Sequence, residues 1–518
     1  MMDEKMPLGR RDIVKPYTWS TASSLQLFGL TTLCIFTGTL LFYGFFYSPH
    51  QDLAGSALSG RLAVTLGESF GNYSIYFPPV EKFWFSLAAH LSELTGLRLD
   101  IVVVAMTNIM VLVGAGLGYR IRCATVGASP LFLILSVLFF VILPILFKNV
   151  FGLREHLVAL GLWPYLVLRL SNPDVEKVGW RLRTLLGLWM GTMLLFKYVY
   201  SLVVLLVELV DTLMKRHPLL LLRTENLIAG TIVFLYLFFW LGIDPAQREA
   251  IGAMRSAIDA NLLERSESLS KMVANLMPAI LLLVASWYFR VSKRLTAIAL
   301  AIVIATVFAA WSQGRWYTHH LLPVTMAYFL WWWIAAQQFR WHVNIAVALL
   351  VILPVAAQFL STQVYQQQTS ELEQALEADG RSVTGERVAI LTMHPSPYNQ
   401  YLASHNALRW NPMMNNAYVS AELKPFDNKE MARTPPPVKL DDQGRRMLHD
   451  QMLRLWEDMP PDVLILDRTH RWPLRYINVD WQQVFSEDPR FLAILKNYRP
   501  VTTYDGKRIR FTYYVRTD

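Results

Sequence analysis

The sequence predicts a polytopic α-helical membrane protein with an α/β domain at its C-terminal end. Two observations predict the helical part. The 518 residues are 54% hydrophobic and only 17% charged, and several nearly charge-free runs are long enough to cross about 30 Å of hydrocarbon. A third observation predicts the second domain, because the composition after Ser361 becomes polar and short β-branched runs appear.

The apolar segments predict about eleven transmembrane helices, with the N-terminus inside and the C-terminus outside. The run 184–213 is divided in two, because Phe196-Lys197-Tyr198 interrupts it and a lysine at mid-bilayer is costly. We therefore expect two short helices that meet at the outer face. The predicted spans are residues 25–47, 100–118, 130–147, 157–168, 184–196, 199–213, 226–243, 271–289, 295–311, 320–337 and 342–361.

The charges support this orientation. Residues 1–24 form a basic tail without a cleavage-site pattern, so we expect a retained cytoplasmic segment. The alternate loops are basic, as the positive-inside rule requires, and they account for most of the formal net charge of +9 without nucleic acid as a partner. The basic residues predicted inside include Arg120, Arg122, Arg169, Lys177, Arg181, Arg183, Lys215, Arg216, Arg223, Arg290, Lys293, Arg294 and Arg340.

The parts outside the membrane are predicted in outline. The transmembrane domain covers 25–361, a polar helical connector 362–380 and an extracytoplasmic α/β domain 381–518. In that domain RVAILTM and PDVLILDR read as buried strands, 443–457 and 487–497 as helices, and KRIRFTYYVRT as an edge strand or hairpin. In the long first outer loop, the stretch from Val80 to Leu94 is amphipathic and fits an interfacial helix.

Charged and aromatic residues recur where the predicted outer loops meet helix ends. If the helices pack as a bundle, these groups converge on one cavity at the outer leaflet. Lysine and arginine bind phosphate oxygens, aromatic rings stack on a sugar or isoprenoid, and a carboxylate can act as a base, so the mixture suits a phosphorylated lipid substrate. The residues are Asp52, Glu68, Glu81, Lys82, Lys148, Arg154, Glu155, His156, Lys197, Gln313, Arg315, Trp316, Tyr317, His319 and His320.

Four segments in this order resemble the GT-C superfamily of membrane glycosyltransferases, which includes protein O-mannosyltransferase and aminoarabinose-transferase-like families. They are Asp52 followed by YFPPVEKFWFSL (76–87), FGLREHLVALGLWPYL (151–166), LLFKYVY (194–200) and QGRWYTHHLLP (313–323). The sequence departs from the family pattern at Phe77, where His is usual, at Val80-Glu81-Lys82, and at Tyr198, where Pro usually follows the lysine. The resemblance covers residues 25–361.

The resemblance implies an inverting transfer of a sugar from a polyprenyl-phosphate donor, with roles for individual residues. Asp52 would be the catalytic base, and cations near the departing phosphate would stabilise the charge that grows on it. No Asp-x-Asp motif suggests a metal and no other cofactor is implied, while dependence on a divalent metal stays open. The donor phosphate would be bound by Lys197, Arg154, Arg315 and His320, and the substrates by Glu155, His156, His319, Tyr317, Lys82 and Glu68.

Each of these residues also has an ordinary structural interpretation. Asp52 fits the N-cap of an outer helix, because Asp is common at that position. Arg154-Glu155-His156 fits an interfacial patch in which Glu155 simply pairs with a neighbour, and Lys197 fits a salt bridge to a buried acid. His319-His320 fits a hydrogen-bonded pair at a helix start, for which no further metal ligands can be placed from the sequence.

The sequence therefore predicts a glycosyltransferase of the bacterial inner membrane whose site faces the periplasm. The donor sugar would be a hexose or a pentofuranose such as arabinose, and the acceptor a glycan, a lipid or a protein. A transporter or flippase of a lipid-linked anion would use the same cationic cavity, but it would not need Asp52 as a base. Cys34 and Cys123 lie in an apolar run and a basic loop, which predicts neither a disulfide nor a zinc site.

Overall fold

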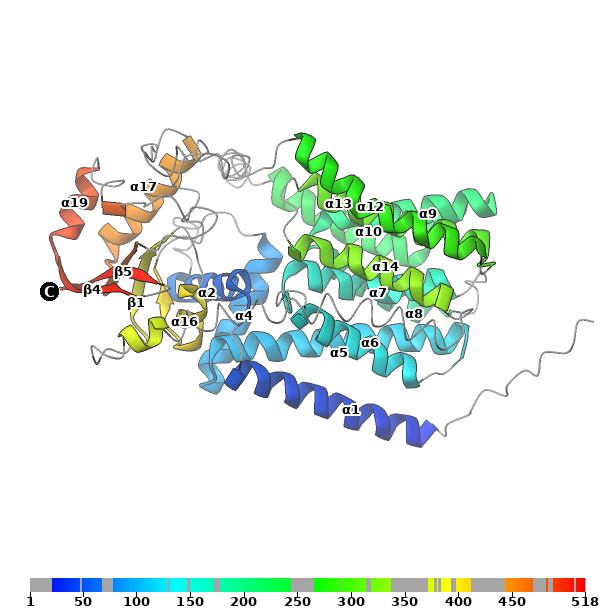
Figure 1. Cartoon of the computed structure of the whole chain (residues 1–518), viewed down its shortest axis with the longest axis horizontal. Coiled ribbons are helices and arrows are strands. Elements are labelled where there is room, and N and C mark those ends of the chain that lie inside the picture. The colour runs from blue at the N-terminus through cyan, green and yellow to red at the C-terminus, as the bar shows by residue number, and fades with distance from the viewer. Residues whose placement is uncertain are drawn as a thin grey trace, which may run out of the picture.

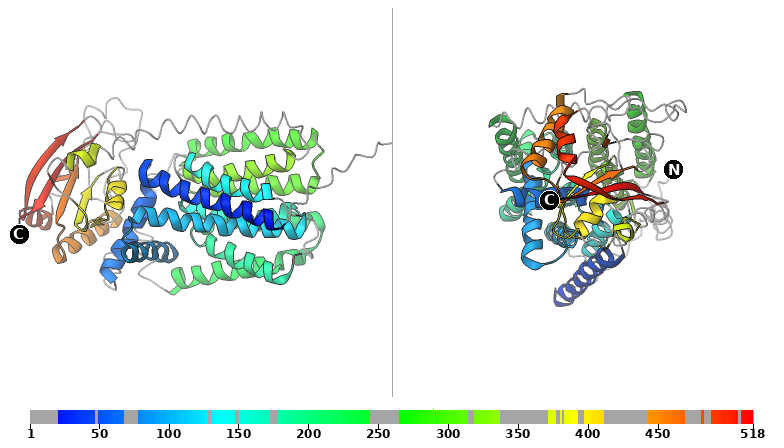
Figure 2. Two further views of the ribbon diagram at one scale, coloured as in Figure 1. Left: turned by 90° about the horizontal axis from the view of Figure 1, so that it is seen from below. Right: turned by 90° about the vertical axis from the view of Figure 1, so that its left-hand side faces the viewer.

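The protein consists of a helical bundle with a smaller α/β domain at one end, and helices α2 and α4 lie between the two (Figure 1). The view from below shows the same arrangement (Figure 2). The structure, a computed structural model, describes residues 21–46, 49–67, 78–127, 130–146, 150–171, 178–243, 265–288, 290–313, 318–336, 371–376, 380, 383–392, 397–410, 443–468, 481–482, 488–506 and 509–517.

The bundle helices follow the predicted spans. Three of the described helices are long and apolar enough to cross a membrane: Leu99–Thr125, Ser266–Tyr288 and Lys293–Ser312. The predicted span 342–361 lies outside the described residues, and so does the loop 244–264. The helices are α1 (Thr21–Leu41), α5 (Leu99–Thr125), α6 (Pro130–Leu146), α7 (Arg154–Ser171), α8 (Trp180–Leu194), α9 (Ser201–Lys215), α10 (Thr224–Leu237), α12 (Arg265–Tyr288), α13 (Lys293–Ser312) and α14 (Leu322–Ala336).

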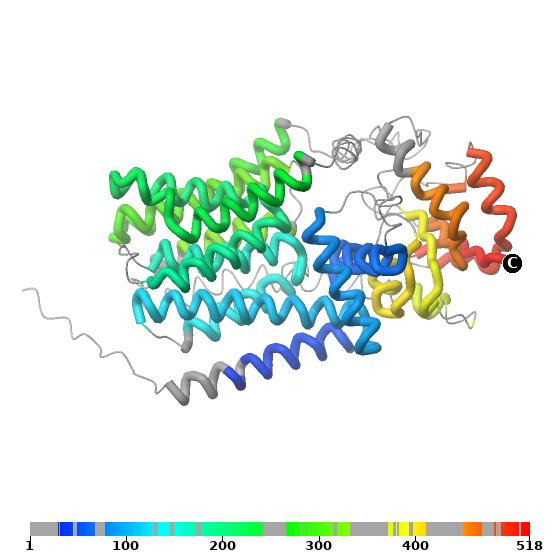
Figure 3. The backbone as a smooth tube through the Cα atoms, turned by 180° about the vertical axis from the view of Figure 1, so that it is seen from behind, coloured from blue at the N-terminus to red at the C-terminus, as the bar shows by residue number. Residues whose placement is uncertain are grey.

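Short segments of other helical types adjoin several of these helices. Two are π-helical: η1 (Phe42–Phe46) continues α1, and η6 (Phe238–Ile243) continues α10. The 3₁₀ segments are η4 (Tyr198–Tyr200), η5 (Pro218–Leu222) and η7 (Thr318–Leu321). Helix α1 lies along the outside of the bundle, as the view from behind shows (Figure 3), and it contacts α5 and α6.

The break predicted inside the run 184–213 is confirmed. Helix α8 ends at Leu194, Lys197 adopts a non-helical backbone conformation, and η4 leads into α9. The chain reverses here, because the residues near the start of α8 and the end of α9 belong to the same ion network at the far end of the bundle. The lysine therefore lies at a turn between two helices and not in the middle of one.

Two helices form the described part of the loop predicted as the first outer loop. Helix α2 (Gln51–Leu66) packs closely on α4 (Pro79–Thr95), and a Cβ atom added to Gly60 would come within 2.3 Å of the carbonyl carbon of Phe85. The amphipathic stretch predicted from Val80 to Leu94 is this second helix, and its buried face includes Trp84, Phe85, Ala88 and Ala89. Glycine at position 60 is thus required by the close approach of two helices.

The α/β domain contains a five-stranded sheet of order β2-β1-β3-β5-β4. Strands β1 (Arg387–Leu391) and β3 (Val463–Asp467) are buried, as their apolar runs predicted, and they pair in parallel inside the sheet. The C-terminal segment forms β5 (Arg510–Arg516), which pairs with β3 on one side and with β4 (Tyr498–Asp505) on the other. The hairpin expectation therefore holds, but β5 is internal and β4 is the edge strand.

The remaining elements of this domain are short. Strand β2 (Leu408–Arg409) was not predicted, because two residues carry no periodic pattern. Helices α17 (Gln443–Asp458) and α19 (Pro489–Leu495) match the two predicted helices. Helix α16 (Tyr398–Ser404) was also not predicted, and it contacts α2 of the first outer loop.

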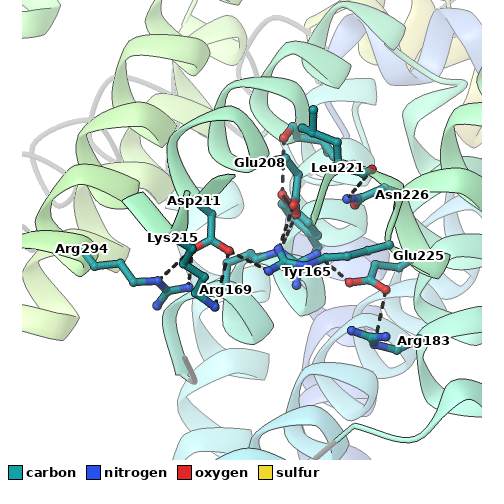
Figure 4. Close-up of polar contacts among 12 residues, drawn as sticks. Tyr165, Arg169, Arg183, Glu208, Asp211, Lys215, Leu221, Glu225, Asn226 and Arg294 are labelled. Carbon is teal, nitrogen blue, oxygen red and sulfur yellow. Dashed lines mark hydrogen bonds and ion pairs between the residues drawn. The ribbon is translucent and has the colours of Figure 1, made fainter. Parts of the chain in front are cut away.

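An ion network ties together α7, α8, α9, α10 and α13 at the end of the bundle away from the α/β domain (Figure 4). Arg169 is completely buried, and it donates to Glu208 at 2.5 Å and to Glu225 at 2.6 Å. Arg223 donates to Glu208 and Asp211, both at 2.8 Å. The other members are Tyr165, Arg183, Lys215 and Arg294.

This network corrects the interpretation of three basic residues as loop charges. Arg169 and Arg223 are buried, and Arg294 pairs with Asp211, so none of the three is simply solvated. Ions in a low-dielectric interior must be paired, since an isolated charge there loses several kcal/mol of hydration energy. The acids Glu208, Asp211 and Glu225 supply that pairing.

Candidate functional site

Polar side chains from four separate segments meet where the bundle faces α2 and α4. Asp52 comes from the start of α2, Arg154 and Glu155 from the start of α7, Lys197 from the turn after α8, and His319 and His320 from η7 before α14. Glu155 Oε1 lies 4.0 Å from His319 Nε2 and 3.7 Å from His320 Nε2, and the same carboxylate forms a salt bridge with Lys197. We call these six residues the polar cluster.

Asp52 lies in the first turn of α2, but it is not the helix cap. The cap is His50, whose Nδ1 accepts a hydrogen bond from the Asp52 backbone N–H at 3.2 Å. The same Nδ1 is 3.6 Å from Asp52 Oδ2, and the Asp52 side chain is 45% exposed. The N-cap interpretation of Asp52 is therefore wrong, and its carboxylate points out of the helix where a substrate can reach it.

Glu155 and Lys197 form the buried centre of the polar cluster. The Lys197 ammonium donates to Glu155 Oε1, and the two side chains are 15% and 2% exposed. This contact is the salt bridge to a buried acid that is the ordinary interpretation of Lys197. In the present structure Lys197 is thus held by a protein carboxylate, and a phosphate would have to share it.

The two histidines connect this buried pair to Asp52. The His319 and His320 rings are in edge contact with centroids 4.4 Å apart, and the His50 and His319 rings are 6.0 Å apart. Burial lowers the pKa of His319 to about 4, so the ring is neutral at pH 7. His319 is therefore not a cation for phosphate at neutral pH.

A second acid on α4 holds the most exposed cation of the polar cluster. Arg154 Nη1 is 3.4 Å from Glu81 Oε2, and the Arg154 side chain is 44% exposed. Ser56 donates to the other Glu81 oxygen at 3.0 Å, which fixes the buried carboxylate. The long contact leaves Arg154 able to turn toward an anion at small energetic cost.

His156 differs from its two neighbours in sequence, because it points into the bundle. It is fully buried, its ring lies near those of Phe140 and Phe151, and its Nδ1 accepts from the Gly152 N–H at 3.0 Å. His156 thus has a packing role in this structure, and its predicted contact with a substrate stays a prediction.

The other candidate residues are not part of the described cluster. Lys82 is exposed on α4, next to Glu81. Glu68, Arg315 and Tyr317 lie outside the described residues, as do Phe77, Lys148 and Trp316. Their predicted roles in substrate and phosphate binding stay predictions.

Among the residues that the structure describes, two groups could hold a divalent cation. One is His50, Asp52 and His319, and the other is Glu155, His319 and His320; in each, the ligand atoms lie within 4.8 Å of one another. Neutral imidazole and carboxylate suit zinc, manganese or a similar ion. In the second group Lys197 occupies a carboxylate oxygen of Glu155, so a metal would compete with the lysine there.

The arrangement can therefore supply a base and two paired cations. Asp52 offers an accessible carboxylate near His50 and His319, while Arg154 and Lys197 are held by Glu81 and Glu155. Sequence inspection assigned no role to His50, although it directly precedes the Gln51-Asp52 pair and lies in a predicted outer loop. The signal that could have found it is the preference for a short polar side chain or ring acceptor before a helix start.

Comparison with known proteins gives only distant structural neighbours. No protein-family model and no curated protein matches the chain. Among solved structures, it is similar to ArnT from Cupriavidus metallidurans in the apo state, with 13% identity, a TM-score of 0.41, and 96% of this chain and 98% of that chain covered. It is also similar to the Archaeoglobus fulgidus oligosaccharyltransferase tethered with an acceptor peptide, with 11% identity, a TM-score of 0.40, and 96% and 74% covered.

Both neighbours are less than 15% identical to this chain. At this identity and TM-score, the likeness is a similarity and does not assign an activity to the chain. The function is therefore inferred from the residues of the polar cluster.

Proposed function

We propose that the protein is an inverting membrane glycosyltransferase that moves a sugar from a polyprenyl-phosphate donor to an acceptor outside the membrane. The observation that carries this proposal is the polar cluster. An accessible acid, a buried salt bridge between Glu155 and Lys197, and two histidines come from distant segments. His319 lies near both the Asp52 and the Glu155 carboxylates, and Arg154 directly precedes Glu155. The ion network at the other end of the bundle, in contrast, pairs its acids and bases deep inside the protein.

The proposed chemistry uses Asp52 as general base. Its carboxylate takes the proton of the acceptor hydroxyl, and the hydroxyl oxygen attacks the anomeric carbon from the face opposite the phosphate. The bond from that carbon to the phosphate oxygen breaks, and the electron pair leaves with the lipid phosphate. Arg154 and Lys197 stabilise the charge that grows there, because a preorganised cation needs no reorganisation during the reaction.

The burial of Glu155 fits a supporting role in this scheme. It is 2% exposed and keeps Lys197 at the turn between α8 and α9, so it orients a cation and does not itself serve as the base. His319, between Asp52 and Glu155, can donate or accept one hydrogen bond to the sugar or the phosphate. We therefore propose a positioning role for Glu155, in place of the direct substrate contact expected from the sequence.

The donor class, the cellular location and the acceptor are parts of the same proposal. A donor lipid enters from the membrane beside the bundle, and an acceptor glycan, lipid or protein approaches from the side of the α/β domain. With the polar cluster at the end that carries this domain, the site would face the periplasm of a bacterial inner membrane. A hexose and a pentofuranose are both compatible with one carboxylate and a phosphate clamp.

The test is transfer of sugar from a synthetic polyprenyl-phosphate donor by the purified protein in lipid nanodiscs. Asp52→Asn keeps the shape of the side chain and removes the base, so we expect the rate to fall by about 100-fold or more. Glu457→Gln, on the exposed face of α17, is the matched control and should leave the rate unchanged. Full activity of Asp52→Asn would show that another group is the base, and lipid translocation without transfer would favour a flippase.

A further inference from the structure

The α/β domain is attached to the helix that carries Asp52. Helix α16 and strand β2 of the domain contact α2, and α16 also contacts α5 (Figure 1). Two asparagines of the domain, Asn399 on α16 and Asn406 just after it, make the polar bonds across this junction. The contacts thus join the soluble domain directly to the first turn of the candidate catalytic helix.

Asn399 holds the backbone next to Asp52. Its Nδ2 donates to the carbonyl oxygen of Gln51 at 3.0 Å, and its Oδ1 accepts from Arg409 Nη1 at 2.6 Å. Asn399 and Arg409 are 3% and 2% exposed, so both bonds are shielded from water. The side-chain amide of Asn399 is therefore held by β2 through Arg409 and by α2 through the Gln51 carbonyl, so it links the position of β2 to that of the start of α2.

The sheet fixes the other side of this contact. Asp467, the last residue of β3, accepts hydrogen bonds from the Tyr398 hydroxyl at 2.9 Å and from Thr392 Oγ1 at 2.6 Å. Tyr398 directly precedes Asn399 at the start of α16. A buried carboxylate with two hydroxyl donors therefore sets the first turn of α16 against the sheet.

Asn406 forms the second attachment, ten residues further along α2. Its Oδ1 accepts from Arg61 Nη1 at 3.1 Å and from the backbone N–H of Leu99 at 3.0 Å. Leu99 begins α5, whose own cap residue Arg98 makes no side-chain capping bond. Asn406 thus caps α5, a helix of the bundle. Its φ of 53° lies in the left-handed region, where asparagine is tolerated.

We propose that the α/β domain positions the catalytic base, and that Asn399 is a positioning residue for Asp52. This inference rests on the proposed function. A base must be held in reach of the proton it takes, and a misplacement of about 1 Å can cost about 100-fold in rate. The bond from Asn399 to the Gln51 carbonyl lies one residue from Asp52, so it sets the direction of the first turn of α2.

Two variants separate this role from a general effect on folding. Asn399→Ala removes both amide bonds, whereas Asn399→Asp keeps an acceptor for Arg409 but cannot donate to the Gln51 carbonyl. Asn497→Ala, at an exposed position of the same domain, is the matched control. We expect both Asn399 variants to lower kcat by about 10- to 100-fold, with the donor KM within twofold of wild type and no effect in the control.

Hydrogen exchange of the full-length protein gives a readout that does not depend on activity. In both variants we expect the amides in the first turn of α2 to exchange about tenfold faster, with α4 unchanged. Unchanged kcat and unchanged exchange would overturn the positioning role. If the wild type transfers no sugar, the proposed function fails, while the exchange of α2 still decides whether Asn399 positions this helix.

Discussion

We expect the contributions of Glu155 and Lys197 to the free energy of unfolding to be strongly coupled, because the two side chains form a buried salt bridge. Changing Lys197 to Met leaves the Glu155 carboxylate buried, with histidine nitrogens at 3.7 and 4.0 Å and, among the described residues, the half-exposed Arg154 as a further cation nearby. Removing one partner of a buried pair costs about 3–5 kcal/mol. Because the charge of Arg154 partly compensates for the lost lysine, we expect Lys197→Met to lower the free energy of unfolding by about 3 kcal/mol, the lower end of that range.

Removing both charges should cost much less than the sum of the single changes. In the double variant with Glu155→Gln and Lys197→Met, no unpaired charge is left in the interior, so we expect a loss of about 1 kcal/mol. With about 2–3 kcal/mol for Glu155→Gln alone, the coupling energy of the cycle is about 4–5 kcal/mol in favour of the pair.

The assay is reversible unfolding in mixed micelles, followed by tryptophan fluorescence for the wild type, both single variants and the double variant. The free energies of unfolding are compared at pH 7 and constant detergent composition. If the effects of the single changes add in the double variant to within about 0.5 kcal/mol, the two side chains are independent and the buried centre of the cluster is not a salt bridge.

Three further predictions concern stability. The side chain of Arg490 lowers the pKa of Asp488 to about 2 from its usual 3.8, so this carboxylate stabilises the fold above pH 3.8, and its contribution is lost as the pH falls toward 2; Asp488→Asn should remove this acid dependence from thermal unfolding curves. Arg169→Met leaves Glu208 and Glu225 without a shared partner and should cost about 3–5 kcal/mol in the same unfolding assay, whereas Arg181→Met, exposed on α8, should cost less than about 0.5 kcal/mol. Gly60→Ala inserts a methyl group against the backbone of α4 and should lower stability by about 1–3 kcal/mol; an unchanged unfolding midpoint would contradict the close packing.

Much of the helical part could be predicted because its signals are strong and local. Long apolar runs give the bundle helices, and one lysine inside such a run correctly marks the turn after α8. The two parallel strands could be predicted for the same reason, since an uninterrupted β-branched run indicates a buried strand. Periodicity and charge are properties of a single segment, so one sequence suffices to read them.

Pairing between distant segments could not be predicted in the same way. Which acid accompanies Lys197 depends on the packing of α7 against α8, and Glu155 and Asp52 are both chemically suitable partners. The direction of His156 depends on helix phase, which is uncertain at a predicted helix start. Likewise, nothing in Asn399 or Asn406 distinguishes them from surface asparagines until α16 is placed on α2.

The order of strands is a further case. The segment of β5 alternates as an edge strand does, yet it lies between β3 and β4. A hairpin pattern identifies two strands but not which of them turns toward the rest of the sheet. That choice is decided by the antiparallel pairing of β5 with β3, a strand more than forty residues earlier in the sequence.

The ion network of Figure 4 has a consequence for how the chain acquires its orientation. Arg169, Arg223 and Arg294 are among the basic residues that predict an inner location, but in the folded protein each is neutralised by an acid of α9 or α10. They can retain a segment on one side of a membrane only while they are still unpaired, as the helices are being inserted. The same arginines would thus act first as topology signals and afterwards as ties between helices, so that neutralising Glu208 or Asp211 would alter assembly without altering the direction of insertion.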